Sequence, residues 1–334
     1  MKLKICILLV VVLSISFCSK SNMSSEELEN YFQKRGTISV SNNIVIVDIS
    51  DQSFEELGYW PFSMKYYEKL IENLNYANAK LIVFDIELDE IAMKKFLDNT
   101  NYDNIVFNGY FDIGNEPSGK DTSGMVCFYP ILLNEKNIEE FTLGINVLRK
   151  LQLLDNNNDV QINNDKGFLE ISNIKIPKYF ANQILVNYYG PANTFPYYHI
   201  DTVLDDRTFQ LRSEKDFGLV FNTFENYLTT GTFKDKIVLV GTSAEELHDL
   251  FLTPFFNPEN GQWLTPGVEI LANFLEMVLN NNYINIKKLK TNNDTSQMTR
   301  VDKDDEEENK EMINLKARLI EQGKNLLEKG KRIR

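Results

Sequence analysis

The chain has 334 residues, of which 43% are hydrophobic and 12% aromatic, and it carries a formal net charge of −13 at pH 7. Its length and hydrophobic content suffice for one large globular domain. Its acidic balance argues against nonspecific nucleic-acid binding, because phosphates attract clustered lysine and arginine side chains. We therefore expect no nucleic-acid partner.

Residues 1–18 have the features of an export signal. Two early lysines precede an apolar stretch over 5–17, which is shorter than the ~20 residues that span a bilayer. Cys18 ends this stretch and opens a polar segment, as at the lipidation site of a bacterial lipoprotein. Three outcomes stay open: lipidation at Cys18, simple secretion after cleavage at Ser16, or an uncleaved anchor. We expect an exported protein that is anchored to the membrane and faces the periplasm or the cell exterior.

The remainder of the chain divides by composition into three parts. Residues 19–43 are predicted to form a polar tether, partly helical around 25–34, and residues 44–286 to form the main domain. Residues 287–334 are predicted to form an acidic linker and an amphipathic helix with a basic end. Three interpretations of that helix stay open: a fraying terminal helix, a self-association seam, or a membrane-surface contact. No apolar segment of spanning length follows residue 18.

A strand-helix-strand pattern opens the main domain. The segments 44–49 and 81–86 are nearly continuous in Val, Ile and Leu, as in strands of parallel sheets that are buried on both faces. Between them, Ser63 is placed as the N-cap of a helix. A shorter helix over 51–57 is predicted to end at Gly58, with Ser53 and Glu56 as its capping box. The apolar stripe of the longer helix consists of Tyr67, Leu70, Ile71 and Leu74.

A similar pattern closes the domain. Residues 236–243 read as a buried strand with a polar exit, and Thr265 followed by Pro266 predicts the start of a helix. Segments 104–107 and 183–186 read as further strands. The predicted fold class is therefore α/β, with a mostly parallel central sheet flanked by helices, in a single main domain with a C-terminal helical tail. The apolar stripe of the closing helix consists of Leu271, Phe274, Leu275 and Val278.

Carboxylates stand near the ends of the predicted strands. Asp48 and Asp85 lie near the carboxyl ends of two strands that we predict to be adjacent, and Asp51 and Asp249 lie near similar exits. Ligands of open α/β sheets bind in the crevice at these ends. Three interpretations stay open: a cation held by Asp48 and Asp85, contact with a polar ligand, or hydrogen bonds that only tie loops to the backbone. No cofactor is expected.

Several fragments are more specific in combination. In order and spacing across residues 44–283, they resemble the second class of the CHASE-type sensor domain, the cyclase/histidine-kinase-associated sensory extracellular domain. The fragments are IVDISDQS at 46–53, GYWPF at 58–62, AKLIVFD at 79–85, VNYYGP at 186–191, KIVLVGTS at 236–243, Asp249, the Thr-Pro pair at 253–254, and PGVEILAN at 266–273.

The resemblance implies an extracytoplasmic α/β input domain that detects an unidentified stimulus. In the family such a domain usually lies between membrane helices that lead to a cyclase or kinase. Here the middle segment, 121–171, departs from the family pattern, and we expect neither spanning helices nor an output domain after residue 286. The resemblance therefore suggests that a separate membrane kinase or cyclase acts as the partner.

We thus expect a non-enzymatic sensory or ligand-binding module that is tethered to the membrane. Trp60 either offers an apolar face to the ligand or anchors its own loop. Two other classes stay open: a metal-dependent enzyme that uses the strand-end carboxylates, and a non-catalytic protein-interaction scaffold. The candidate site for an unknown small ligand consists of Asp48, Asp51, Trp60, Asp85, Thr242, Ser243 and Asp249.

Overall fold

The computed structural model describes residues 24–107, 124–135, 138–155, 160–165, 167–179 and 182–285. The predicted export signal with Cys18, and the predicted linker and helix at 287–334, lie outside these ranges. Over the ranges given, no helix is long and apolar enough to cross a membrane.

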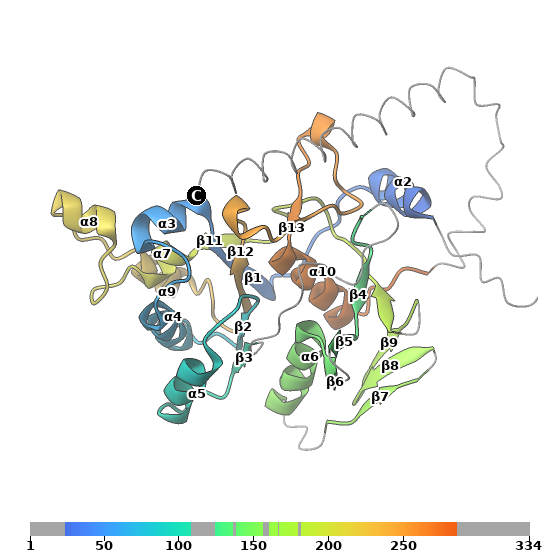
Figure 1. Ribbon diagram of the computed structural model, residues 1–334, viewed down its shortest axis with the longest axis horizontal. Coiled ribbons are helices and arrows are strands. Elements are labelled where there is room, and N and C mark those ends of the chain that lie inside the picture. Colours follow the sequence, from blue (N-terminus) through green and yellow to red (C-terminus); the bar gives the residue numbers. More distant parts are fainter. Residues whose placement is uncertain are drawn as a thin grey trace, which may run out of the picture. The chain divides into compact units, whose positions relative to one another are not determined.

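Five parallel strands form the central sheet, in the order β11-β1-β12-β2-β3 (Figure 1). This confirms the predicted α/β class. The prediction that the first two strands are adjacent is wrong, because β12 lies between them and pairs with both. Every residue of β12 is buried, which suits this central position. The strands are β1 Ile44–Ile49, β2 Leu81–Phe84, β3 Ile105–Phe107, β11 Tyr197–His199 and β12 Ile237–Thr242.

Helices cover both faces of this sheet. Successive side chains of β1 alternate between two hydrophobic clusters: Ile44 and Ile46 pack with α6 and α10, and Val45 and Val47 pack with α4 and α7. The helices are α3 Asp51–Leu57, α4 Met64–Tyr76, α5 Glu90–Asp98, α6 Leu143–Leu154, α7 Ile200–Leu204, α8 Arg212–Phe217, α9 Thr223–Thr230 and α10 Gly267–Leu279, with short 3-10 turns at Glu245–Leu247 and Pro258–Asn260.

The opening helices largely follow the prediction. α4 begins after Ser63 and buries its predicted stripe, and α3 ends at Gly58, where φ is +98°. The predicted capping box of α3 is wrong, because the hydrogen bonds involve Ser50 and Ser53. Glu56 instead accepts a hydrogen bond from the backbone N–H of Ser213 at 3.0 Å, which ties α3 to α8.

The closing helix, α10, begins one residue later than predicted. Thr265–Pro266 forms a short strand, β14, which pairs with β13 at Leu250–Phe251 and so keeps this backbone extended. The helix starts at Gly267, whose N–H donates to the carbonyl of Asp249 at 3.0 Å. A Cβ atom at Gly241 would clash with the side chain of Val268, so glycine permits the close approach of β12 and α10.

The predicted strand at 104–107 belongs to the central sheet as β3, whereas the one at 183–186 forms β10 in a separate antiparallel pair. The middle segment supplies α6 and buried residues such as Leu169 and Ile171 to the main core. Besides β13 and β14, the described strands outside the central sheet are β4 Phe128–Pro130, β5 Leu132–Glu135, β6 Ile138–Phe141, β7 Ile162–Asn164, β8 Phe168–Ile171, β9 Ile174–Pro177 and β10 Gln183–Leu185.

The helix expected within the tether is present as α2, Ser25–Arg35. It is packed against the core, because Leu28 and Phe32 are each only 1% exposed. The Phe32 ring lies edge-on to the ring of Tyr188, at 5.9 Å between centroids. Arg35 donates hydrogen bonds to the Asn187 side chain and the Tyr188 carbonyl. The tether is therefore docked from this helix onward.

Candidate functional site

Asp48 is a buried carboxylate near the end of β1, with 4% of its surface exposed. Its Oδ2 accepts a hydrogen bond from the Ser243 hydroxyl at 2.6 Å, whereas its Oδ1 has no hydrogen-bond partner among the described residues. Burial raises the pKa of Asp48, although Ser243 and His199 oppose this. An unpaired buried acceptor costs about 1–3 kcal/mol. The fold therefore leaves half of this carboxylate unsatisfied.

Residues of β11 and α7 border Asp48. His199 lies opposite Asp48 in the parallel register, and its Nδ1 is 3.1 Å from the Ser50 hydroxyl. Asp201 is buried, and burial raises the pKa of its carboxyl. The sequence prediction missed both residues, because the three-residue strand β11 has no apolar run. The signal that could have found them is the pair of polar residues, His199 and Asp201, on either side of Ile200.

Asp85 and Asp249 form a second acidic pair. Burial raises the pKa of Asp85 to about 6, and burial with the nearby charge of Asp85 raises that of Asp249 to about 8. Two close carboxyls resist double ionisation, so the pair retains a proton near neutral pH. A Cβ atom at Gly267 would lie 2.6 Å from Oδ1 of Asp249, so glycine makes room for this carboxylate at the start of α10.

Glu269, in the first turn of α10, is a carboxylate with a structural role. Its oxygens accept hydrogen bonds from the backbone N–H groups of Asn193 and Thr194, at 2.9 and 2.7 Å, and from the Tyr197 hydroxyl, at 2.9 Å. Burial raises its pKa, and these donors oppose the shift. Glu269 therefore fastens the loop before β11, in contrast to the half-satisfied Asp48.

The other predicted residues have local roles. The Thr242 hydroxyl donates to the Ile49 carbonyl at 2.8 Å and accepts from the Ala244 N–H at 3.0 Å. Trp60 is half-buried and packs edge-on against Phe62, at 5.4 Å between ring centroids. These contacts fit the interpretation of Trp60 as a loop anchor.

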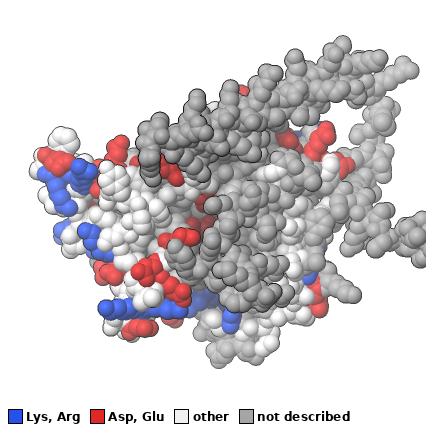
Figure 2. All heavy atoms as spheres, in the orientation of Figure 1, with Lys and Arg blue, Asp and Glu red and all other residues white. Residues whose placement is uncertain are grey.

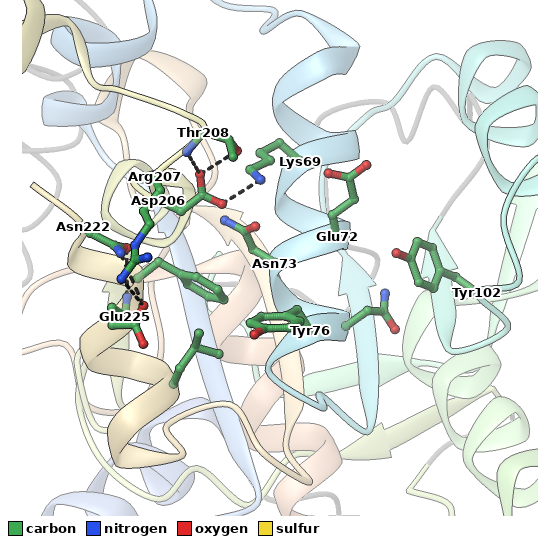
Figure 3. A pocket seen from close by; sticks show the side chains of 13 residues that line it. Lys69, Glu72, Asn73, Tyr76, Tyr102, Asp206, Arg207, Thr208, Asn222 and Glu225 are labelled. Carbon is green, nitrogen blue, oxygen red and sulfur yellow. Dashed lines mark hydrogen bonds and ion pairs between the residues drawn. The ribbon is translucent and has the colours of Figure 1, made fainter. Parts of the chain in front are cut away.

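The structure joins Asp48 to Ser243 and Asp85 to Asp249. Strand β12 lies between the two strands that lead to Asp48 and Asp85, and the charges of Asp48 and Asp249 both raise the pKa of Tyr197. Asp51 is exposed in the first turn of α3. In the described part of the chain, no three His, Cys, Asp or Glu residues are grouped to hold a metal ion. Two cavities lie along α4, the first of which is drawn in Figure 3, and neither is lined by any of the seven predicted residues.

Comparison with known proteins identifies the family. Neither the curated proteins nor the solved structures contain a match to this chain. A family model described as the CHASE2 domain matches residues 5–299, which include all of the described residues. The chain belongs to the CHASE2 domain family.

Proposed function

We propose that the protein is a membrane-tethered, non-enzymatic sensor that binds a polar ligand at the carboxyl ends of its parallel strands. CHASE2 is an extracytoplasmic sensory domain family, which supports a sensor role. The observation that favours the strand ends is the unpartnered, buried Oδ1 of Asp48 in the part of the chain described above. A ligand that donates a hydrogen bond or brings positive charge would satisfy this atom.

The acidic pair of Asp85 and Asp249 suggests that binding of a cationic ligand at the strand ends depends on the protonation of these two carboxyls. Raised pKa values keep a proton on this pair near neutral pH. A cationic ligand would favour the ionised pair and would displace that proton. We therefore expect cationic ligands at this end of the sheet to bind more tightly as the pH rises from about 6 to about 8.

A thermal-shift screen of the full chain against polar amines, amino acids and divalent ions tests the strand-end site. A ligand present at 100 times its dissociation constant should add ~2.7 kcal/mol of stability. We expect at least one compound to stabilise the parent protein and not Asp48→Asn, with the exposed Asp98→Asn as the matched control. Absence of any such compound, or equal shifts in the parent and Asp48→Asn, would refute the site.

The same screen separates the alternative classes. A shift produced by a divalent ion alone, and lost in both Asp48→Asn and Asp85→Asn, would favour a metal-dependent enzyme. If no small molecule produces a shift but a protein partner is captured, a scaffold is the better description.

We further propose that lipidation of Cys18 provides the tether. The support is the position of Cys18, at the end of a short apolar stretch and before a polar segment. Cys18→Ser should move the protein from the membrane fraction to the soluble fraction and abolish incorporation of a labelled fatty acid. Unchanged partitioning and labelling would contradict lipidation.

A separate membrane kinase or cyclase is the proposed output partner. This rests on the sensory role of the family. Crosslinking in membranes of the native host, followed by purification of the tagged full chain, should recover such an enzyme. Recovery of the chain alone, at every crosslinker concentration, would contradict the proposal.

A further inference from the structure

A polar cleft runs along α4, and none of the strand-end candidates lines it; Figure 3 shows the larger of its two cavities. It consists of a cavity of about 840 Å³ and a second of about 550 Å³. These volumes lie within the range of small-molecule sites. The two cavities share Lys69, Glu72, Arg207 and Thr208, so they adjoin along α4 and are treated together as the cleft.

One end of the cleft is basic, although the chain as a whole has a net charge of −13. Four basic side chains line the second cavity, against the two carboxylates of Glu68 and Glu72. Figure 2 shows both basic and acidic side chains at the tip formed by α8, the helix that carries Lys215. This end of the cleft therefore favours an anion. Its basic residues are Lys65, Lys69, Arg207 and Lys215.

Lys69 is oriented by a carboxylate that is itself held in place. Its Nζ lies 2.6 Å from Oδ2 of Asp206, and its side chain is only 19% exposed. The other oxygen of Asp206 accepts hydrogen bonds from the Thr208 N–H and hydroxyl and from the Phe209 N–H. Burial alone would raise the pKa of Asp206, but the hydrogen bonds from Lys69 and Thr208 lower it. An ammonium has three N–H donors, so Lys69 retains donors for a ligand.

Arg207 lines both cavities together with Lys69, but its side chain is less constrained than that of Lys69. Its side chain is 82% exposed, and its ion pair with Glu225 is long, at 4.0 Å. Exposed pairs of this kind contribute about 0–1 kcal/mol. The guanidinium can therefore turn toward a ligand bound at Lys69 at small cost, and its planar fork suits a phosphate or a carboxylate.

The other end of the cleft combines an aromatic face with polar groups. Tyr76 is 74% exposed and lines the cavity beside Leu228 of α9. The Asn73 side chain donates to the Val203 carbonyl at 2.9 Å, which fixes it in the wall. A sugar presents C–H groups to an aromatic ring and hydroxyls to carboxylates such as Glu72.

We propose that this cleft binds an anionic sugar, with the phosphate or carboxylate at Lys69 and Arg207 and the sugar ring against Tyr76. This would be a second ligand site on the domain, separate from the strand ends. A sugar phosphate and a sugar acid share the required chemistry. Because its basic residues are partly exposed, binding should weaken as salt is raised from about 0.05 to about 0.5 M.

Calorimetric titration of the full chain in detergent tests the proposal with glucose 6-phosphate, glucuronate, glucose and inorganic phosphate. At least one of the two anionic sugars should bind with a Kd at least tenfold lower than those of glucose and phosphate. Arg207→Gln should raise that Kd about tenfold, whereas Lys94→Gln, an exposed lysine on α5, should leave it unchanged. Tyr76→Ala should weaken binding of the anionic sugar and leave phosphate binding unchanged.

Four results would overturn the proposal: no saturable binding, equal affinity for glucose and both anionic sugars, phosphate binding as tightly as the sugars, or equal effects of Arg207→Gln and Lys94→Gln. Folding of Lys69→Gln is checked by circular dichroism. If that variant unfolds, Arg207→Gln, at an exposed position, still tests the anion site. Asp48→Asn should leave sugar binding unchanged, so failure of the strand-end site and failure of this cleft can be distinguished.

Discussion

Glu269 and Asp48 are both buried carboxylates on the α10 side of the sheet, but their surroundings differ. Glu269 accepts hydrogen bonds from backbone N–H groups and from a tyrosine hydroxyl, whereas Asp48 accepts one at Oδ2 and none at Oδ1 in the described residues. The sequence predicted Asp48 from its place near the end of an apolar strand. It could not distinguish the two roles, because these hydrogen bonds come from segments far apart in the chain.

The pair of Asp85 and Asp249 makes a prediction about pH at the scale of the residue. The folded-state pKa of Asp249 is raised from 3.8 to about 8, so the folded protein binds more protons than the unfolded chain between these values. This contribution to stability is complete below pH ~4 and is lost as the pH rises toward about 8. Asp249→Asn cannot ionise, so its stability relative to the parent protein should rise with pH over this interval, by at most ~1.4 kcal/mol per pH unit.

Urea denaturation at a series of pH values measures this difference. The exposed Asp98→Asn serves as the control and should show no comparable trend. If the difference between Asp249→Asn and the parent protein were constant from about pH 4 to about pH 8, the raised pKa would be wrong.

At the scale of elements, two close packings hold the strand ends in place. Gly241 lets α10 approach β12, and Gly267 makes room for Asp249 at the first turn of the same helix. Gly241→Ala should lower the free energy of unfolding by about 1–3 kcal/mol, because overpacking forces the two elements apart. Gly167→Ala is the matched control, since a Cβ atom added at Gly167 would meet nothing within 4 Å. Equal urea midpoints for the two variants would contradict the packing argument.

The attachment of α2 depends on Arg35. Its guanidinium donates to Asn187 and Tyr188 and lies 4.8 Å from the centroid of the Phe32 ring. Arg35→Ala should therefore speed amide hydrogen exchange over residues 25–35 by at least tenfold and leave β1 and β12 protected. Lys34 is exposed in the same turn, so Lys34→Ala serves as the control. Its amide hydrogens over residues 25–35 should exchange at the rate of the parent protein. Similar exchange in both variants would show that Arg35 does not hold the helix.

The sequence predicted the elements whose apolar pattern is local and strong. β1, β2, β12 and the buried face of α4 are examples, because continuous apolar runs and a 3.6-residue period are visible without tertiary information. The insertion of β12 between β1 and β2 was not visible, since strand order depends on contacts between distant segments. The short strand β11 lacks a pattern of its own, and its pairing with β1 brings His199 beside Asp48.

At the scale of the whole molecule, the family assignment and the fold agree. The match to the CHASE2 domain covers residues 5–299, and the described core is α/β with a parallel central sheet. The cavities along α4 could not be predicted from the sequence. Their lining residues come together only in the folded chain, from α4, the turn after α7, α8 and α9. Two chemically different regions therefore result, an acidic one at the strand ends and a locally basic cleft beside α4.

An extracytoplasmic sensor must have its core on the outer side of the cytoplasmic membrane. Labelling of a single introduced cysteine tests this location most directly. Tyr59 is 98% exposed, whereas Cys127 is buried, so Tyr59→Cys adds an accessible thiol to the core. A membrane-impermeant maleimide should label this variant in intact spheroplasts well above the unaltered chain, and lysis should not increase the labelling. Labelling of Tyr59→Cys only after lysis would place the domain inside the cell and contradict the extracytoplasmic sensor.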